Sequence, residues 1–289
     1  MAITLPIGCY ELRSNLAGFR VLSDLHNALE QYEDEEIHID CSTLNWLDAH
    51  LAAPLMTVIE HSRAKRNNHQ MYKLNEKVRH ILRKNNTLKK KEEDTHHTTM
   101  PLTRFGLHKE VDFAKYTRDH IDRPEMPNMS SPLRSKFYEG IDELFANCSL
   151  HSKSTVEVCV CGQFFPRTEK LSFTVSDGGI GIAGSLRNAG YNFARAADAI
   201  DWAMQSNNTS RKGDIPGGLG LRLLREFVEA NNGKLTVAST KGVWIQSGSD
   251  VVKGSLRNPF PGTSVILEIN TADKKRYDLK QVTDPRNIW

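Results

Sequence analysis

Three short groups of residues in the second half of the chain have types and spacings suited to nucleotide chemistry. Glu143 and Asn147 are four residues apart, so in a helix both side chains project from the same face. Asp177 begins the sequence DGGIG, and a second glycine-rich sequence, GLGL, occupies residues 218–221. These groups contain the candidate functional residues of the chain, and each has to be held in place by a helix or a strand.

The glycines at residues 217–220 stand where the first turn of a helix is expected, although glycine weakens a helix by about 1 kcal/mol per residue. One interpretation is a loose turn that happens to precede a helix. The other is a phosphate site, because the unpaired N–H groups of a helix N-terminus bind anions and glycine lets them approach closely. In the same chemistry an Asn147 oxygen suits Mg²⁺, Glu143 suits general-base catalysis, and Asp177 suits an exocyclic amine.

The elements that position these groups follow from apolar spacing. We expect a helix capped by Ser131, with Pro132 in the first helical position. Two strands, TVEVCVC and KLSFTVSD, come next, followed by a polar segment at 183–216 that exceeds ordinary loop length. The helix after GLGL ends at Asn232 and Gly233 as a left-handed cap. The sequences KLTVAST, GVWIQSG and GTSVILEIN then predict three further strands.

In this order and on these elements, the patterns E-x-x-x-N, D-x-G-x-G and G-L-G-L resemble the N, G1 and G2 boxes of the GHKL ATPases. That superfamily includes gyrase-type topoisomerases, mismatch-repair ATPases, histidine kinases and anti-sigma-factor serine kinases. The resemblance covers about residues 130–270. It implies a Bergerat-type α/β sandwich, with helices on one face of a mixed sheet, that binds ATP with Mg²⁺ under a mobile lid.

Matched residue by residue, the resemblance assigns a role to each box. Glu143 becomes the general base, Asn147 the Mg²⁺ ligand and Asp177 the residue that recognises adenine. The other cofactor-binding residues that it implies are Gly179, Gly181, Lys212, Gly218, Leu219, Gly220, Leu221, Thr263 and His151. Within this set Gly179 and Gly181 shape the adenine pocket, and the GLGL residues meet the phosphates.

The lid that the resemblance implies is residues 183–216, with Arg211 or Lys212 as phosphate contacts. One departure from the family pattern is Pro216, which occupies a position where glycine is common. Proline fixes φ and has no N–H to donate. The hinge of the lid is therefore expected to be stiffer than usual, with one phosphate contact fewer.

The first half of the chain alternates strands and helices, which predicts an α/β domain. The segment from IHIDCSTLNWLDAH to residue 86 resembles a STAS domain, the anti-sigma-factor antagonist fold, and an unrelated small α/β domain is the alternative. In phosphorylated STAS domains a serine follows the acidic residue at the helix start, whereas here Ala49 follows Asp48. The resemblance therefore implies that this half does not accept phosphate at that position.

The expected domain organisation combines these two resemblances. A STAS-like domain spans residues 1–125 with a charged loop at 85–99, the ATP-binding domain spans 126–275, and a C-terminal tail spans 276–289. We place the boundary between the two domains near residues 122–130.

The composition bounds the function further. The formal net charge is +3 with scattered basic residues, which does not favour nucleic acid, and no run of about 18 apolar residues predicts a membrane span. The N-terminus lacks the layout of a secretory signal, and five cysteines without a C-x-x-C pair fit free thiols in a reducing cytoplasm. We expect Cys159 and Cys161 to pack in a strand rather than bind a metal.

The expected function is a cytoplasmic Mg-ATP-binding regulatory protein, in which hydrolysis or phosphotransfer is coupled to lid closure and to control of a protein partner. Two alternatives stay open: a nucleotide-gated binding switch with little catalysis, and an anti-sigma-type serine kinase acting on a separate STAS protein. The partner is expected to contact the STAS-like half or the lid, and a homodimer is left open. A histidine autokinase is disfavoured, because no helical hairpin bearing a phosphoacceptor histidine precedes the ATPase motifs.

Overall fold

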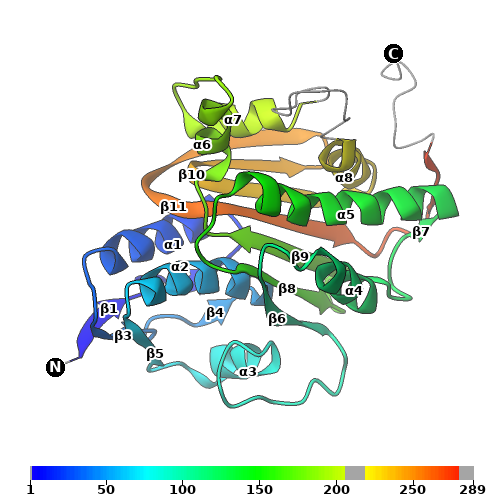
Figure 1. The fold of residues 1–289 in the computed structure, drawn as a ribbon. Helices are drawn as coiled ribbons and strands as arrows, with labels where there is room; N and C mark the ends of the chain where they lie inside the picture. The colour runs from blue at the N-terminus through cyan, green and yellow to red at the C-terminus, as the bar shows by residue number, and fades with distance from the viewer. Residues whose placement is uncertain (1, 206–218, 280–289) are drawn as a thin grey trace.

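The secondary structure stacks in four layers, as the ribbon in Figure 1 shows. The computed structural model describes residues 2–205 and 219–279. A small sheet is followed by a pair of helices, then by a five-stranded sheet, and finally by a second set of helices. One hydrophobic cluster lies on each face of the five-stranded sheet. Both faces of the large sheet are therefore covered.

Residues 2–84 form a unit that we call the N-terminal module. Its small sheet is parallel, in the order β1 (Ile3–Pro6), β3 (Glu36–Asp40) and β5 (Asn68–Tyr72). Its helices are α1 (Leu16–Leu29), α2 (Ala52–Ala64) and α3 (Glu76–Lys84), and the short strands β2 (Glu11–Leu12) and β4 (Trp46–Leu47) pair beside them. The Asn15 and Asn75 side chains accept hydrogen bonds from the first turns of α1 and α3, which fixes where these helices begin.

Helix α2 is buried on nearly all sides. Residues 52–59 at its start are all buried, and a helix that is apolar all round belongs inside a core. It packs against β5 of the small sheet and against β8 and β9 of the large sheet, while α1 packs along β11. Phe260, Ile266, Cys159 and Cys161 of the large sheet join the same cluster. The expected packing of the two cysteines is confirmed, and all five cysteines are free thiols.

The large sheet is antiparallel throughout, in the order β10-β11-β9-β8-β6. Its strands are β6 (Thr99–Phe105), β8 (Val158–Phe165), β9 (Lys170–Asp177), β10 (Lys234–Ser247) and β11 (Asp250–Asn270). The expectation of a mixed sheet is wrong for these strands. The expectation of three strands after residue 233 is also wrong, because KLTVAST and GVWIQSG form one strand that continues through register shifts at Thr240.

Three helices cover the face of the large sheet opposite the N-terminal module: α4 (Glu110–Ile121), α5 (Ser131–His151) and α8 (Leu219–Ala230). Helix α5 begins at Ser131, so its cap residue is Ser130 and not Ser131 as expected. After α8, Asn232 takes the left-handed conformation, with φ of 50°, and closes the helix. Within residues 2–205 and 219–279, no helix is both long and apolar enough to cross a membrane.

The expected boundary near residues 122–130 does not separate the two sheets. Strand β6 precedes it in sequence, yet β6 pairs with β8 as an edge strand of the large sheet. The physical reason is packing, because Met100 and Phe105 of β6 belong to the core beneath α5. In the expected tail, β12 (Arg276–Tyr277) pairs with β7 (Asn128–Met129), which lies next to the start of α5.

Two short helices occupy the described part of the segment that the sequence predicts to be a lid. They are α6 (Gly181–Asn188) and α7 (Ala196–Ala203). Leu186 of α6 and Ile200 of α7 are buried, and both helices contact β10. This part of the segment is therefore regular structure that packs on the edge of the sheet.

Candidate nucleotide-binding site

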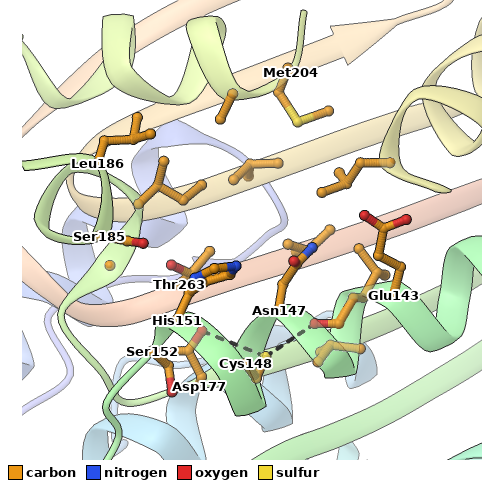
Figure 2. A pocket seen from close by; sticks show the side chains of 18 of the residues that line it. Glu143, Asn147, Cys148, His151, Ser152, Asp177, Ser185, Leu186, Met204 and Thr263 are labelled. Carbon is orange, nitrogen blue, oxygen red and sulfur yellow. Dashed lines mark hydrogen bonds between the residues drawn. The ribbon is translucent and has the colours of Figure 1, made fainter. Parts of the chain in front are cut away.

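A pocket lies between α5, the short helices α6 and α7, and the strands β9, β10 and β11, as Figure 2 shows. It holds about 1020 Å³ of space when its open mouth is included. Residues singled out from the sequence contribute much of its lining: Glu143, Asn147, His151, Asp177, Gly181, Leu221 and Thr263. Segments far apart in the chain thus meet around one cavity.

Helix α5 supplies one row of polar side chains to this pocket. Glu143, Asn147 and His151 follow each other at intervals of four residues, so they share a face of the helix. Figure 2 shows Glu143 and His151 at the two ends of this row, with Asn147 between them. The helix therefore presents a carboxylate, an amide and an imidazole to the same cavity.

Asp177 ends β9 in the wall of the pocket and is only 4% exposed. Its Oδ1 accepts a hydrogen bond from the Gly179 N–H at 2.8 Å, and the Cys148 thiol donates to its Oδ2 at 3.7 Å. Burial raises the pKa of Asp177 to about 6, although these donors and the Thr263 backbone act to lower it. The group is thus mostly ionised at neutral pH but close to titration, which is common at functional sites.

The turn after Asp177 needs glycine because it runs close to the end of α5. A Cβ on Gly179 would stand 2.0 Å from the Ser152 carbonyl oxygen. The Ile180 N–H donates to that same oxygen at 2.7 Å. Gly181 has a φ of 69°, a region that residues with a Cβ rarely adopt. The glycines of DGGIG therefore shape the corner of the pocket next to the buried carboxylate.

Ser239, which the sequence reasoning missed, supports two residues that line the pocket, Ile182 and Thr263. Its Oγ accepts a hydrogen bond from the Ile182 N–H at 2.8 Å, and it lies 3.0 Å from Thr263 Oγ1 and 3.2 Å from the Gly262 carbonyl oxygen. The next residue, Thr240, has a φ of 50°, which is unusual for a β-branched side chain. No periodic pattern marks Ser239, because its contacts depend on the irregular strand at Thr240.

The rest of the pocket wall is largely apolar. Ile182 and Leu186 come from α6, Met204 follows α7, and Val265 comes from β11. Trp202 of α7 also lines the pocket, and its ring centroid lies 4.7 Å from that of Tyr191. Flat aromatic ligands favour walls of this kind, with a few polar groups to fix their orientation.

The residues expected to contact phosphate are only partly described. Lys212 and Gly218, together with Arg211 and Pro216, lie outside the described residues. Leu219 and Gly220 form the start of α8, and Leu221 lines the pocket. The N-terminal turn of α8 therefore borders the cavity, next to the apolar wall.

The described residues fit an adenine nucleotide at its base end. Asp177 offers a buried acceptor for the adenine amine, and the apolar walls suit the ring. Asn147 offers an amide oxygen, and Mg²⁺ commonly combines one such protein ligand with phosphate oxygens and waters. A cation held in this way does not need several ligands from the protein. Within residues 2–205 and 219–279, no group of three or more His, Cys, Asp or Glu residues is suited to hold a metal ion.

Comparison with known proteins supports the same assignment. Residues 133–271 match the family model described as histidine kinase-, DNA gyrase B- and HSP90-like ATPase. A search of curated proteins finds no match for the chain. The family match contains the elements that surround the pocket but does not reach the N-terminal module, whose STAS resemblance stays a prediction. Residues 133–271 therefore match a GHKL-type ATPase domain, and this match supports ATP binding.

Proposed function

We propose that this chain binds Mg-ATP in the pocket beneath α6 and α7 and couples the nucleotide to control of a protein partner. The observation that supports this most is convergence: Asp177, Asn147 and Leu221 belong to separate motifs yet line one cavity. A chance resemblance of three short motifs gives no reason for their side chains to meet. The pocket is therefore the place where nucleotide chemistry is to be tested.

The proposed roles follow from the position of each side chain. The Asp177 carboxylate accepts a hydrogen bond from the adenine amine, while Ile182 and Val265 contact the ring. Asn147, one helical turn from Glu143 on α5, holds the cation beside the phosphates. The start of α8 offers backbone N–H groups, which favour anions at a helix N-terminus.

Glu143 is the proposed general base. It lines the pocket one helical turn from Asn147, where it orients an attacking water or hydroxyl and takes up its proton. A positioned base contributes about 10²- to 10⁴-fold to a rate. This role accounts for hydrolysis and for transfer to a protein hydroxyl equally well, since both begin with attack by an oxygen nucleophile.

The test compares phosphate release and nucleotide binding in the wild type, Glu143→Gln and Asp177→Asn. Glu143→Gln keeps the size of the side chain, so we expect binding to persist while turnover falls at least 100-fold. Asp177→Asn replaces an acceptor oxygen with an amide, so we expect thermal stabilisation by Mg-ATP to disappear. Full stabilisation of the Asp177→Asn protein by Mg-ATP would refute the adenine assignment.

A nucleotide-gated switch with little catalysis is the second candidate. It is supported by the position of Trp202 and Leu186, which lie on α7 and α6 and face the pocket directly. A bound ligand would therefore contact α6 and α7, which also form part of the protein surface. Ordering of a segment on ligand binding is a common switching mechanism. Capture of a partner in ATP but not in ADP, without phosphate release by the wild type, favours this candidate.

A serine kinase acting on a separate STAS protein is the remaining form of the enzyme hypothesis. The chain's own Ala49 is 4% exposed and sits in the short helix Ala49–Leu51 that leads into α2. The native residue has no hydroxyl to accept phosphate, and even a serine at this position would be buried. Any phosphoacceptor of this kind is therefore proposed to lie on another protein.

A further inference from the structure

Helix α2 of the N-terminal module touches the turn that follows Asp177. His61 Nε2 lies 2.7 Å from the Gly178 carbonyl oxygen, and Thr57 Oγ1 donates to Ser176 Oγ at 2.9 Å. These contacts join residues 117 and 119 positions apart in the sequence. A Cβ on Gly178 would stand 2.4 Å from His61 Nε2, so the imidazole lies directly against the turn.

One peptide group connects His61 to the buried carboxylate. The Gly178 carbonyl and the Gly179 N–H belong to the same peptide unit, and this N–H donates to Asp177 Oδ1 at 2.8 Å. His61 thus binds one end of the peptide group while Asp177 binds the other. Hydrogen bonds in such a chain polarise one another, and the planar peptide transmits any rotation from one end to the other.

The hydrogen-bond pattern also defines the state of the imidazole. A carbonyl oxygen only accepts, so His61 Nε2 must carry a proton and donate it. Burial lowers the pKa of His61 and so favours the neutral ring, although the bond to Gly178 opposes this. The groups that face it are the His26 ring at 5.5 Å and the side chains of Glu30 and Lys65.

We propose that His61 is a positioning residue of the nucleotide site, and that the N-terminal module sets nucleotide affinity through it. His61 does not touch the nucleotide in this arrangement. It holds the Gly178–Gly179 peptide in the orientation that keeps the Asp177 carboxylate ready for the adenine amine. This inference rests on the proposed function, since it concerns the affinity of that pocket.

The experiment compares His61→Gln, whose amide NH₂ can still donate to the Gly178 oxygen, with His61→Leu, which keeps bulk but has no donor. The matched control is His69→Gln, since His69 is another half-buried histidine of the module and contacts Ser62 at 2.9 Å rather than the turn. Affinity for a fluorescent ATP analogue with Mg²⁺ is measured on the full chain. Hydrogen exchange of the Gly179 amide is measured without nucleotide.

We expect His61→Leu to bind the analogue about fivefold more weakly, which corresponds to the loss of one typical net hydrogen bond. For His61→Gln and His69→Gln, we expect the affinity for the analogue to stay within about twofold of the wild-type value. The Gly179 amide exchanges faster in His61→Leu than in the other two variants. If His61→Leu does not fold, His61→Asn replaces it, because the shorter amide does not span the distance to Gly178.

Equal affinity and equal Gly179 exchange in His61→Leu and the wild type overturn the inference. Equal weakening in the Gln and Leu variants also overturns it, because packing and not the donor would then be responsible. If the wild type binds no nucleotide, the proposed function fails, and the exchange of Gly179 still decides whether His61 positions the turn. The two failures are therefore distinguishable.

Discussion

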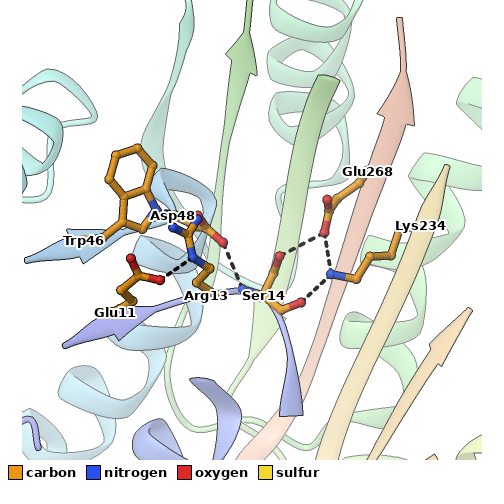
Figure 3. A network of polar contacts seen from close by, with 7 residues as sticks. All are labelled: Glu11, Arg13, Ser14, Trp46, Asp48, Lys234 and Glu268. Atoms are coloured by element: carbon orange, nitrogen blue, oxygen red, sulfur yellow. Dashed lines mark hydrogen bonds and ion pairs between the residues drawn. The ribbon is translucent and has the colours of Figure 1, made fainter. Parts of the chain in front are cut away.

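Ser14 Oγ donates a hydrogen bond to Glu268 Oε1 at 2.9 Å, although 254 residues separate the two in sequence. Lys234 Nζ joins the pair, at 2.5 Å from the Ser14 carbonyl oxygen and 3.1 Å from Glu268 Oε1. The Ser14 N–H in turn donates to Asp48 Oδ2 at 3.0 Å. Figure 3 shows this network, which ties the segment before α1 to strands β10 and β11.

Replacing Glu268 with alanine tests the strength of this connection. Glu268 is 9% exposed and Ser14 5% exposed, so the change leaves the buried Ser14 hydroxyl without its acceptor. The Lys234 ammonium group loses one of its two acceptors and keeps the Ser14 carbonyl oxygen. We expect the free energy of unfolding to fall by about 1–3 kcal/mol. The measurement is urea unfolding of the full chain.

The control for this variant is Glu11→Ala. Glu11 pairs with Arg13 at 2.8 Å, but both side chains are more than 40% exposed, at 42% and 44%. Exposed pairs contribute about 0–1 kcal/mol, so little change is expected. A loss in Glu268→Ala no larger than that in Glu11→Ala would show that the network does not hold the module in place.

The buried Asp177 carboxylate is expected to favour nucleotide binding but to lower the stability of the folded chain. Its pKa is about 6 in the folded chain against an ordinary 3.8, so the folded state binds this proton more tightly than the unfolded state. Stability therefore falls as pH rises from about 4 to about 6, by at most about 3 kcal/mol. Without nucleotide, Asp177→Asn should be more stable than the wild type at pH 8, and this advantage should vanish at pH 4.

Urea unfolding at both pH values checks this prediction. Asp198→Asn is the control, because Asp198 is paired with Arg195 and the pKa of Asp198 is lowered by that partner. Its replacement removes a favourable contact, so it should bring no gain in stability at pH 8. An Asp177→Asn protein with the same stability difference at pH 4 and pH 8 would contradict the assignment of a buried carboxylate with a raised pKa.

Ser239→Ala should loosen the wall of the pocket. The change removes the acceptor for the Ile182 N–H at the start of α6 and the contact with Thr263 Oγ1. We expect a loss of about 1–3 kcal/mol in stability and faster hydrogen exchange across residues 181–188. The exposed Ser247 at the end of β10 is the matched control, and Ser247→Ala should leave both quantities unchanged. Unaltered exchange in Ser239→Ala would contradict its role.

Phe260→Ala should destabilise both sheets together. Phe260 of β11 is 1% exposed, and its ring packs edge-on against Phe19 of α1 at a centroid distance of 5.6 Å. Removing a buried phenylalanine costs about 3–5 kcal/mol. Circular dichroism and tryptophan fluorescence should report one coincident transition in both wild type and variant.

The control is Val252→Ala, at a position 62% exposed, which should change stability by less than about 0.5 kcal/mol. Two separate transitions in the wild type would contradict the shared core.

The local part of the site can be predicted from the order of residues in the chain. Glu143, Asn147 and His151 share a face of α5 because a helix repeats every 3.6 residues, and that spacing is visible without a structure. Asp177 ends the alternating segment KLSFTVSD, and the glycines that follow it favour the end of a strand. The α/β alternation of the first half also followed from apolar periodicity. These features depend on neighbours within about one or two turns, so the chain order alone contains them.

Which distant surfaces meet depends on how the layers pack in three dimensions. It placed β6 in the large sheet, covered the second face of that sheet with α1 and α2, and brought His61 to Gly178 and Ser239 to Ile182. An apolar pattern states that a face is buried but not what buries it, because hydrophobic burial is non-directional. Long-range hydrogen bonds such as these form only after the layers have packed, so no local signal in the sequence announces them.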